Sequence, residues 1–279
     1  MTKKEIVIIG GVAGGATAAA RIRRLDEHAN ITIFEQGEYI SFANCGLPYY
    51  AGGEIQEKEN LLLQTPKGFK RRYNIDVKVL NQVIEIDKAN KRVKVKDLAN
   101  NEEYYKEYDV LLLAMGAKPV KIFKDVYTIR NIPDIEKIKE KAETSKSAVI
   151  IGGGYVGLEM AENLYKKGLD ITIIEKAEHI IASIDRDMAE IAHKYLLRKG
   201  VKLLLNTGVK SVENNIVTLE NGETINADLV ISAVGVRPDV EIAKNAGIRI
   251  GNLGGVVVDE HMQTSEKDIY AARRYGRSN

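Results

Sequence analysis

The sequence is poor in cysteine and in large aromatic side chains. Its 279 residues include one cysteine, no tryptophan and only 6% aromatic residues. A single cysteine excludes an internal disulfide and any cysteine-rich metal site, so we predict no metal centre. It is also typical of a reducing compartment, and we expect a cytoplasmic protein.

Charge of one sign and long apolar runs are lacking as well. The 41 lysines and arginines nearly balance the 39 aspartates and glutamates, which leaves a formal net charge of +2. This balance predicts no nucleic-acid partner. No apolar run approaches the roughly 20 residues that span a bilayer, and the N-terminal residues lack the pattern of a signal peptide. We therefore expect no membrane partner.

The sequence does contain one structural unit twice. Ile6–Gly10 resembles Ala148–Gly152, and Ile31–Glu35 resembles Ile171–Glu175. Each copy runs from a buried strand through a glycine-rich turn into a helix, and then to a strand that ends at an acid. Continuous β-branched strands of this kind are typical of parallel sheets. Helices are predicted over residues 14–28, 155–167 and 187–199.

Two matched strand exits predict the domain organisation. One buried strand ends at Gly116 and Pro119, and another ends at Gly235 and Pro238. We expect the chain to cross between domains at these points, which gives the segments 1–115, 116–235 and 236–279. The predicted fold class is α/β, with two Rossmann-like domains that contain parallel sheets and β-meanders, the second inserted in the first.

The second copy carries a dinucleotide fingerprint, Gly152-Gly-Gly154-Tyr-Val-Gly157. The first glycine makes the tight turn, the second lets the backbone approach a pyrophosphate, and the third lets helix and strand pack closely. Glu175 stands at the next strand end, where it would accept a hydrogen bond from a ribose 2′-hydroxyl. This carboxylate favours NADH over NADPH, although Lys176 beside it weakens the preference. A glycine-rich turn of another α/β fold is the alternative.

The first copy, Gly10-Gly-Val12-Ala-Gly14-Gly15, departs from the fingerprint because Val12 takes the place of the second glycine. Glu35 follows at the corresponding strand end. Two dinucleotide sites in one chain suggest an electron relay between a tightly held redox cofactor and an exchanging hydride carrier.

Cys45 lies in the run Ser41-Phe-Ala-Asn44-Cys45-Gly-Leu-Pro48. A helix can begin there with Pro48 in its first turn, and a thiol at a helix N-terminus has a lowered pKa and is nucleophilic. A buried, unreactive cysteine is the alternative, and composition alone favours it.

One face of the first predicted helix is polar and basic. Thr17, Arg21, Arg24 and His28 are spaced so that they share this face. The face either binds the phosphates of an anionic substrate such as coenzyme A or is an ordinary solvated helix surface.

Taken in order, these motifs resemble the flavin-dependent pyridine nucleotide–disulfide oxidoreductases. More narrowly, they resemble the branch of coenzyme A-disulfide reductases, which includes coenzyme A-persulfide reductases and related NADH oxidases. The resemblance extends to about Tyr270, and the Ser41–Pro48 segment is its most specific part.

The resemblance implies FAD on the first copy, NAD(P)H on the second, and coenzyme A as a substrate that forms a mixed disulfide with Cys45. Tyr155 would gate the nicotinamide pocket. The expected substrate contacts are Thr17, Arg21, Arg24, Ser41 and Asn44. The expected FAD contacts are Gly10, Val12, Ala13, Gly14, Gly15, Glu35, Gln36, Val83, Ala114, Gly116 and Arg130. The expected NAD contacts are Gly152, Gly154, Tyr155, Val156, Gly157, Glu159, Glu175 and Gly235.

A single cysteine cannot cycle as an intramolecular dithiol, so Cys45 must cycle through a mixed disulfide, a persulfide or a sulfenic acid. The predicted function is an oxidoreductase that passes electrons from NADH via FAD to a coenzyme A disulfide or persulfide. An NADH oxidase that uses a Cys45 sulfenic acid, or an inactive nucleotide-binding fragment, is the alternative.

The sequence departs from the family at three places. Met115 replaces a usual threonine, and Ala13 replaces the catalytic histidine of NADH peroxidases of this class, which argues against a peroxidase. After Ala272 the family continues with Gly-Asp, the rest of the FAD domain and a dimerisation domain. We therefore expect a truncated chain with an aberrant tail over residues 273–279, from a frameshift or an added segment. We also expect weak FAD retention, with dimerisation left open.

Overall fold

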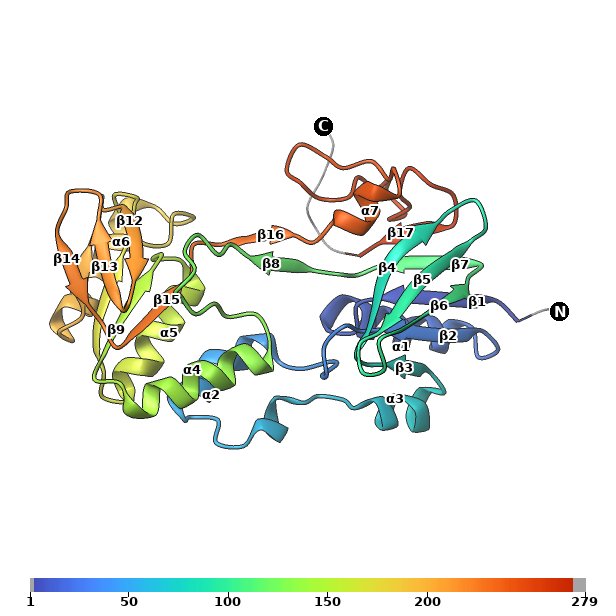
Figure 1. Ribbon diagram of the computed structural model, residues 1–279, viewed down its shortest axis with the longest axis horizontal. Coiled ribbons are helices and arrows are strands. Elements are labelled where there is room, and N and C mark those ends of the chain that lie inside the picture. Colours follow the sequence, from blue (N-terminus) through green and yellow to red (C-terminus); the bar gives the residue numbers. More distant parts are fainter. Residues whose placement is uncertain (1–2, 273–279) are drawn as a thin grey trace. The chain divides into compact units, whose positions relative to one another are not determined.

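The computed structural model describes residues 3–272, and the predicted aberrant tail lies outside them (Figure 1). The chain forms two compact units. Unit 1 contains the residues up to 42, residues 62–117 and those from 238 onward, and unit 2 contains residues 43–61 and 118–237. Two of the four crossings between the units, after residues 117 and 237, lie two residues beyond the expected boundaries at 115 and 235. Residues 43–61, which carry Cys45, differ from that expectation because they pack with unit 2.

Unit 1 is built on a five-stranded parallel sheet with the strand order β17-β7-β1-β2-β3. Its strands are β1 (Glu5–Ile9), β2 (Asn30–Phe34), β3 (Asp76–Lys78), β7 (Val110–Leu113) and β17 (Ile269–Ala271). A three-stranded antiparallel meander accompanies the sheet, formed by β4 (Asn81–Asp87), β5 (Arg92–Asp97) and β6 (Glu102–Glu107). The helices of unit 1 are α1 (Ala13–Leu25), α3 (Pro66–Tyr73) and α7 (Glu241–Asn245).

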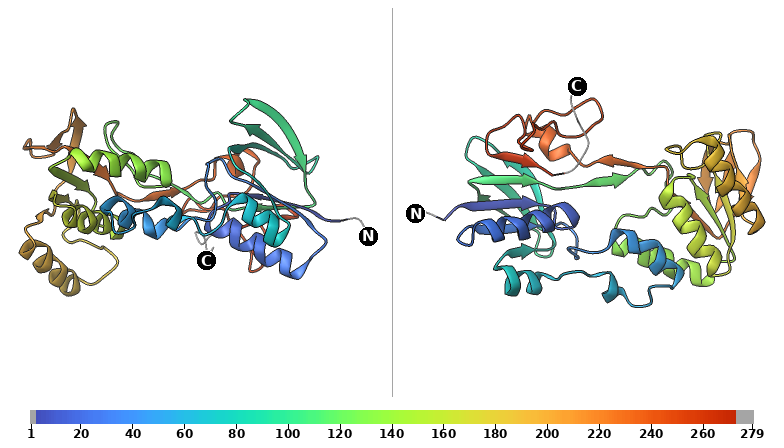
Figure 2. Two further views of the ribbon diagram at one scale, coloured as in Figure 1. Left: turned by 90° about the horizontal axis from the view of Figure 1, so that it is seen from below. Right: turned by 180° about the vertical axis from the view of Figure 1, so that it is seen from behind.

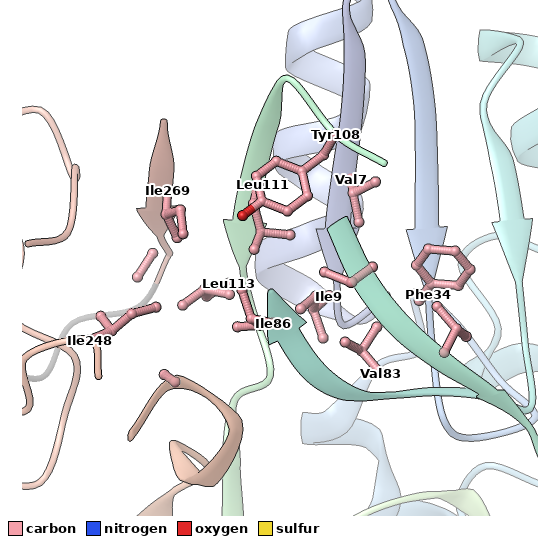
Figure 3. Close-up of a cluster of buried hydrophobic side chains, with 14 residues drawn as sticks. Val7, Ile9, Phe34, Val83, Ile86, Tyr108, Leu111, Leu113, Ile248 and Ile269 are labelled. Atoms are coloured by element: carbon pink, nitrogen blue, oxygen red, sulfur yellow. The ribbon is translucent and has the colours of Figure 1, made fainter. Parts of the chain in front are cut away.

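The two faces of β1 have different partners because successive side chains of a strand point to opposite sides. Val7 and Ile9 pack in one buried cluster with side chains of the meander, as Figure 3 shows. Ile6 and Ile8 pack in the other, with alanines of α1 and Phe69 of α3. The left view of Figure 2 shows the meander on one side of the sheet and α1 on the other.

Unit 2 repeats the plan with a four-stranded parallel sheet in the order β11-β10-β9-β15. Its strands are β9 (Ser147–Ile151), β10 (Asp170–Ile174), β11 (Lys202–Leu204) and β15 (Leu229–Ser232). Its helices are α2 (Leu47–Gly52), α4 (Ile132–Thr144), α5 (Tyr155–Lys166) and α6 (Arg186–Arg198). A small antiparallel sheet contains β12 (Val209–Glu213), β13 (Ile216–Leu219) and β14 (Thr224–Asn226).

Two of the passages between the units run along paired strands, β8 (Ala117–Pro119) and β16 (Val236–Pro238). Each follows a glycine with a positive φ, +75° at Gly116 and +114° at Gly235. These are the two matched exits that the sequence predicts.

The predicted helices α1, α5 and α6 are present, but α1 ends three residues early. Asp26 is extended, with φ −140° and ψ 101°, and its Oδ1 accepts hydrogen bonds from the N–H groups of His28 and Ala29. His28 therefore leaves the helix and does not share the face of Thr17, which corrects the expectation. Among residues 3–272, no helix is long and apolar enough to cross a membrane.

Candidate functional site: two glycine turns and an exposed thiol

The turn after β1 leaves room only for glycine at both of its ends. Gly10 has φ +98°, and a Cβ built on it would lie 2.3 Å from the carbonyl oxygen of Ala114 at the end of β7. A Cβ on Gly15 would lie 1.8 Å from the carbonyl oxygen of Gly10. At Gly14 the nearest atoms would lie at an ordinary distance of 3.6 Å or more. The turn thus brings α1 against β1, whereas a Cβ at Gly14 would only touch its neighbours.

Glu35, directly after β2, stabilises this turn through hydrogen bonds. Its Oε2 accepts a hydrogen bond from the Gly11 N–H at 2.8 Å, and its Oε1 accepts one from the Gly37 N–H at 2.8 Å. Each carboxylate oxygen has a further lone pair, so a ribose hydroxyl can still donate to it. The carboxylate therefore stabilises the turn as well as offering acceptors to a ligand.

The turn after β9 is built in the same way. Gly152 has φ +107°, and its Cβ would lie 2.6 Å from the carbonyl oxygen of Ala233 at the end of β15. A Cβ on Gly157 would lie 2.1 Å from the carbonyl oxygen of Gly152. A Cβ on Gly154 would meet nothing within 4 Å. The first and last glycines are thus required by the fold, and Gly154 leaves open space at the start of α5.

Glu175 repeats the role of Glu35. Its Oε2 accepts the Gly153 N–H at 2.6 Å, and its Oε1 accepts the Ala177 N–H at 2.8 Å. Gly11 and Gly153 are absent from the expected site residues, although both copies of the repeat carry a glycine at this position. That shared glycine is the signal that identifies them.

Val12 fits the first turn because its position does not require a glycine conformation. Val12 precedes α1 with φ −90°, and Gly154 precedes α5 with φ −77°. Neither lies in the left-handed region that favours glycine. The φ at this position therefore allows valine, although ψ differs between the copies, −122° at Val12 and 179° at Gly154.

The Cys45 side chain is exposed, which makes the alternative of a buried cysteine wrong. It lies in a 3₁₀ turn, Asn44–Gly46, directly before α2, and Pro48 stands in the first turn of that helix as predicted. Asn44 is exposed as well. Ser41 belongs to unit 1 and adopts a left-handed φ of +46°, held by a hydrogen bond from its N–H to the Gly11 carbonyl at 3.0 Å.

The segment after Cys45 packs on α4 and α5. A Cβ on Gly52 would lie 2.7 Å from the Cβ of Asn163, so only glycine allows α2 to approach α5 this closely. The Lys139 ammonium of α4 lies 3.8 Å from the centre of the Tyr50 ring, and burial raises the pKa of the Tyr50 hydroxyl. These contacts explain why the thiol segment groups with unit 2.

The start of α5 presents further expected NAD contacts. Tyr155 is 60% exposed, and its hydroxyl lies 3.1 Å from Ser183 Oγ. Val156 is exposed. Burial, with a smaller effect of Glu162, raises the pKa of the Glu159 carboxyl. The structure therefore brings Tyr155, Val156 and Glu159 together on the helix that follows the Gly154 turn.

The remaining expected FAD contacts are dispersed. Ala13 and Gln36 are exposed near the first turn, whereas Val83 is 5% exposed and packs in the core beneath the meander. Arg130 belongs to unit 2 and precedes α4. A pocket at the carboxyl ends of β7 and β17 is lined by residues that include Met115, Gly116, Pro238, Val256, Ala271 and Ala272.

The basic face of α1 is available for a ligand. Thr17, Arg21 and Arg24 are exposed, and in the described part of the chain neither arginine pairs with an acid. Arg23, by contrast, donates to the carbonyl oxygens of Tyr73 and Asn74, at 2.8 and 3.0 Å. Residues 3–272 contain no group of three or more His, Cys, Asp and Glu side chains that could hold a metal ion.

Residues 4–272 match the family model described as pyridine nucleotide-disulphide oxidoreductase. The chain belongs to this family. Coenzyme A disulfide reductase of Staphylococcus haemolyticus is 36% identical over 273 residues, which are 96% of this chain and 62% of the relative.

Two solved structures resemble this family member closely. The reduced CoADR-RHD of Bacillus anthracis has a TM-score of 0.95 and 42% identity, and the match covers 97% of this chain and 51% of that one. The NAD-dependent persulfide reductase of A. fulgidus has a TM-score of 0.92 and 38% identity, with coverage of 96% and 52%. The family resemblance expected from the motifs is confirmed, and the chain spans about three fifths or less of the length of these proteins.

Proposed function

We propose that this chain forms the nucleotide-binding and thiol-bearing part of an oxidoreductase that transfers electrons from NADH via FAD to a coenzyme A disulfide or persulfide. The observation that carries the proposal is the pair of equivalent glycine turns together with a single exposed thiol, Cys45. The similarity to a coenzyme A disulfide reductase and a persulfide reductase supports the choice of sulfur substrate.

The first turn fits FAD. Backbone N–H groups at the start of α1 suit a pyrophosphate, and Glu35 retains lone pairs for a ribose. Residues Gly10, Val12, Ala13, Gly14, Gly15 and Glu35 would hold it. When bound, FAD supplies two-electron chemistry between a nicotinamide and a disulfide.

The second turn would hold the pyridine nucleotide through Gly152, Gly154, Gly157 and Glu175. The Gly154 position leaves the space that a pyrophosphate needs. An acidic side chain at the Glu175 position accepts a hydrogen bond from a ribose 2′-hydroxyl and disfavours a 2′-phosphate, which supports NADH rather than NADPH.

Cys45 performs the sulfur chemistry in this proposal. Its thiolate attacks one sulfur of the coenzyme A disulfide, forms a Cys45–coenzyme A mixed disulfide and releases one coenzyme A thiolate. Two electrons from NADH then reduce the mixed disulfide to the Cys45 thiolate and a second coenzyme A thiolate. The exposed arginines of α1, Arg21 and Arg24, would bind coenzyme A phosphates.

The test compares the full chain, supplied with FAD, with its Cys45→Ser variant. We expect the wild type to oxidise NADH when coenzyme A disulfide is added. The variant should lose this activity but still pass electrons from NADH to a dye acceptor, since only the thiol has changed. Turnover of coenzyme A disulfide by the variant would refute the thiol mechanism.

The same experiment separates the alternative functions. Oxygen consumption that needs Cys45 but no disulfide would indicate an NADH oxidase. A protein that takes up no flavin and shows no absorption in the visible range would be a nucleotide-binding fragment instead.

A further inference from the structure

Lys176, the residue directly after Glu175, forms an ion pair with Glu220, which lies in the turn after β13. The Lys176 Nζ lies 3.3 Å from Glu220 Oε1. The Glu220 N–H donates to the Gly208 carbonyl oxygen at 2.9 Å. A Cβ on Gly208 would lie 2.2 Å from the Glu220 carboxyl carbon, so the Glu220 side chain lies directly over the glycine. The backbone hydrogen bond positions Glu220 where its carboxylate reaches Lys176.

The same loop is tied to the expected ribose-binding acid. Thr207 N–H donates to the Glu175 carbonyl oxygen, and Asn206 N–H donates to the Ala177 carbonyl oxygen, both at 3.0 Å. Two backbone hydrogen bonds therefore align residues 206–207 with residues 175–177. Glu220 reaches the edge of the predicted nucleotide site through this alignment.

Lys176 occupies the position at which a cation would select a phosphorylated nucleotide. NADP(H) differs from NAD(H) by a 2′-phosphate, and a basic residue near the ribose-binding acid accommodates that phosphate. The Lys176 side chain is 80% exposed, so a phosphate can approach it. Its ammonium is directed instead to Glu220.

The first copy of the repeat provides an internal comparison. There the residue after the acid is Gln36, which is neutral, and the ribose of FAD carries no 2′-phosphate. In the second copy the corresponding lysine is matched by a carboxylate. In both copies, therefore, the residue after the acid offers no unpaired positive charge to a 2′-phosphate.

We propose that Glu220 determines the nucleotide specificity of unit 2. By pairing with Lys176 it withholds the ammonium from a 2′-phosphate, and it adds a second negative charge near Glu175. The site therefore takes NAD(H) in preference to NADP(H). This inference rests on the proposed nucleotide-binding function of unit 2.

The test measures the binding of NAD⁺ and NADP⁺ to the full chain by isothermal titration calorimetry. In Glu220→Gln, which keeps the shape of the side chain, we expect NADP⁺ to bind about 3- to 10-fold more tightly, because Lys176 becomes free to make a charge-assisted contact with phosphate. The affinity for NAD⁺ should stay within about twofold, since NAD⁺ has no group for Lys176. Adding Lys176→Met to Glu220→Gln should remove the gain.

The matched control is Glu143→Gln. Glu143 is 59% exposed and pairs with Lys167 on the same unit, and Glu220 is 57% exposed. This variant removes the same charge from the unit and should leave both affinities unchanged. If Glu220→Gln proves unstable by thermal unfolding, Glu220→Ala replaces it in the same comparison.

The outcomes distinguish the inference from the proposed function. If the wild type binds NAD⁺ and the ratio of the two affinities is unchanged in Glu220→Gln, the inference is overturned and the proposed function stands. It is also overturned if the gain survives Lys176→Met or appears equally in Glu143→Gln. If the wild type binds neither nucleotide, both fail.

Discussion

Two glycines of the second turn should respond to alanine in opposite ways. Gly157 lies where a Cβ would be 2.1 Å from the Gly152 carbonyl oxygen, whereas a Cβ on Gly154 would meet nothing within 4 Å. We therefore expect Gly157→Ala to damage the fold of unit 2. Gly154→Ala should leave the fold intact and damage nucleotide binding.

The loss of stability expected for Gly157→Ala follows from the contact that its Cβ would make with the Gly152 carbonyl oxygen. A separation of 2.1 Å is far below the 3.0 Å that real Cβ atoms essentially never breach. The atom in the way belongs to the backbone, so it cannot move aside by a change of rotamer, and α5 must shift from β9. Overpacking of this kind costs about 1–3 kcal/mol, and we expect a value near 3. For a unit of this size that lowers the Tm by roughly 6–12 °C.

The second effect acts on the ligand. Gly154 has φ −77°, which alanine adopts freely, so the free energy of unfolding should change by less than about 1 kcal/mol. The added methyl group would occupy the space at the start of α5, where a pyrophosphate approaches the backbone. We expect the affinity for NAD⁺ to fall at least about tenfold, which corresponds to about 1.4 kcal/mol.

Thermal unfolding followed by circular dichroism and calorimetric titration with NAD⁺ measure the two effects on the same samples. A Gly157→Ala protein that melts within about 2 °C of the wild type would refute the packing argument. A Gly154→Ala protein that binds NAD⁺ as tightly as the wild type would refute the assignment of this turn to the nucleotide.

Two further predictions concern stability and the thiol segment. Asp228 accepts hydrogen bonds from the N–H groups of Lys146 and Ser147, which hold the pKa of its carboxyl below the ordinary 3.8. The ionised Asp228 carboxylate therefore stabilises the folded state fully above the unfolded-state pKa. This stabilisation is lost as the pH falls through the lower folded-state pKa. We expect Asp228→Asn to lower the Tm at pH 7, and the difference in Tm from the wild type should vanish in acid. Gly52→Ala should loosen α2 from Asn163, and limited proteolysis should then cut the segment faster; an unchanged rate would contradict this.

The repeated unit could be predicted from the sequence because its signals are local. The strands β1 and β9 are continuous apolar runs, and the turns carry glycine in fixed register. Helix α4 also has a full signal, with Asn131 as its N-cap and Ile132, Ile135 and Ile138 on its buried face, yet it is not among the predicted helices. The spacing of its buried isoleucines is itself sufficient to predict this helix.

Other features depend on contacts between residues distant in sequence. Nothing local indicates that residues 43–61 pack with unit 2, because the decisive fit is between Gly52 and Asn163. The assignment of Val83 to a ligand likewise came from the resemblance, whereas burial between sheet and meander explains that side chain by packing. The pairing of Lys176 with Glu220 joins residues 44 positions apart.

The two copies of the repeat separate what the fold requires from what a ligand would select. Where the copies agree, at the first and last glycines and at the acid, the structure shows close approach and hydrogen bonds that close the turn. Where they differ, Val12 stands against Gly154, neither with a positive φ, and Gln36 stands against Lys176, both exposed. Exchange of the residues at the differing positions should therefore alter nucleotide preference with little effect on stability, whereas substitution of the shared first or last glycine should lower the Tm of the unit that carries it.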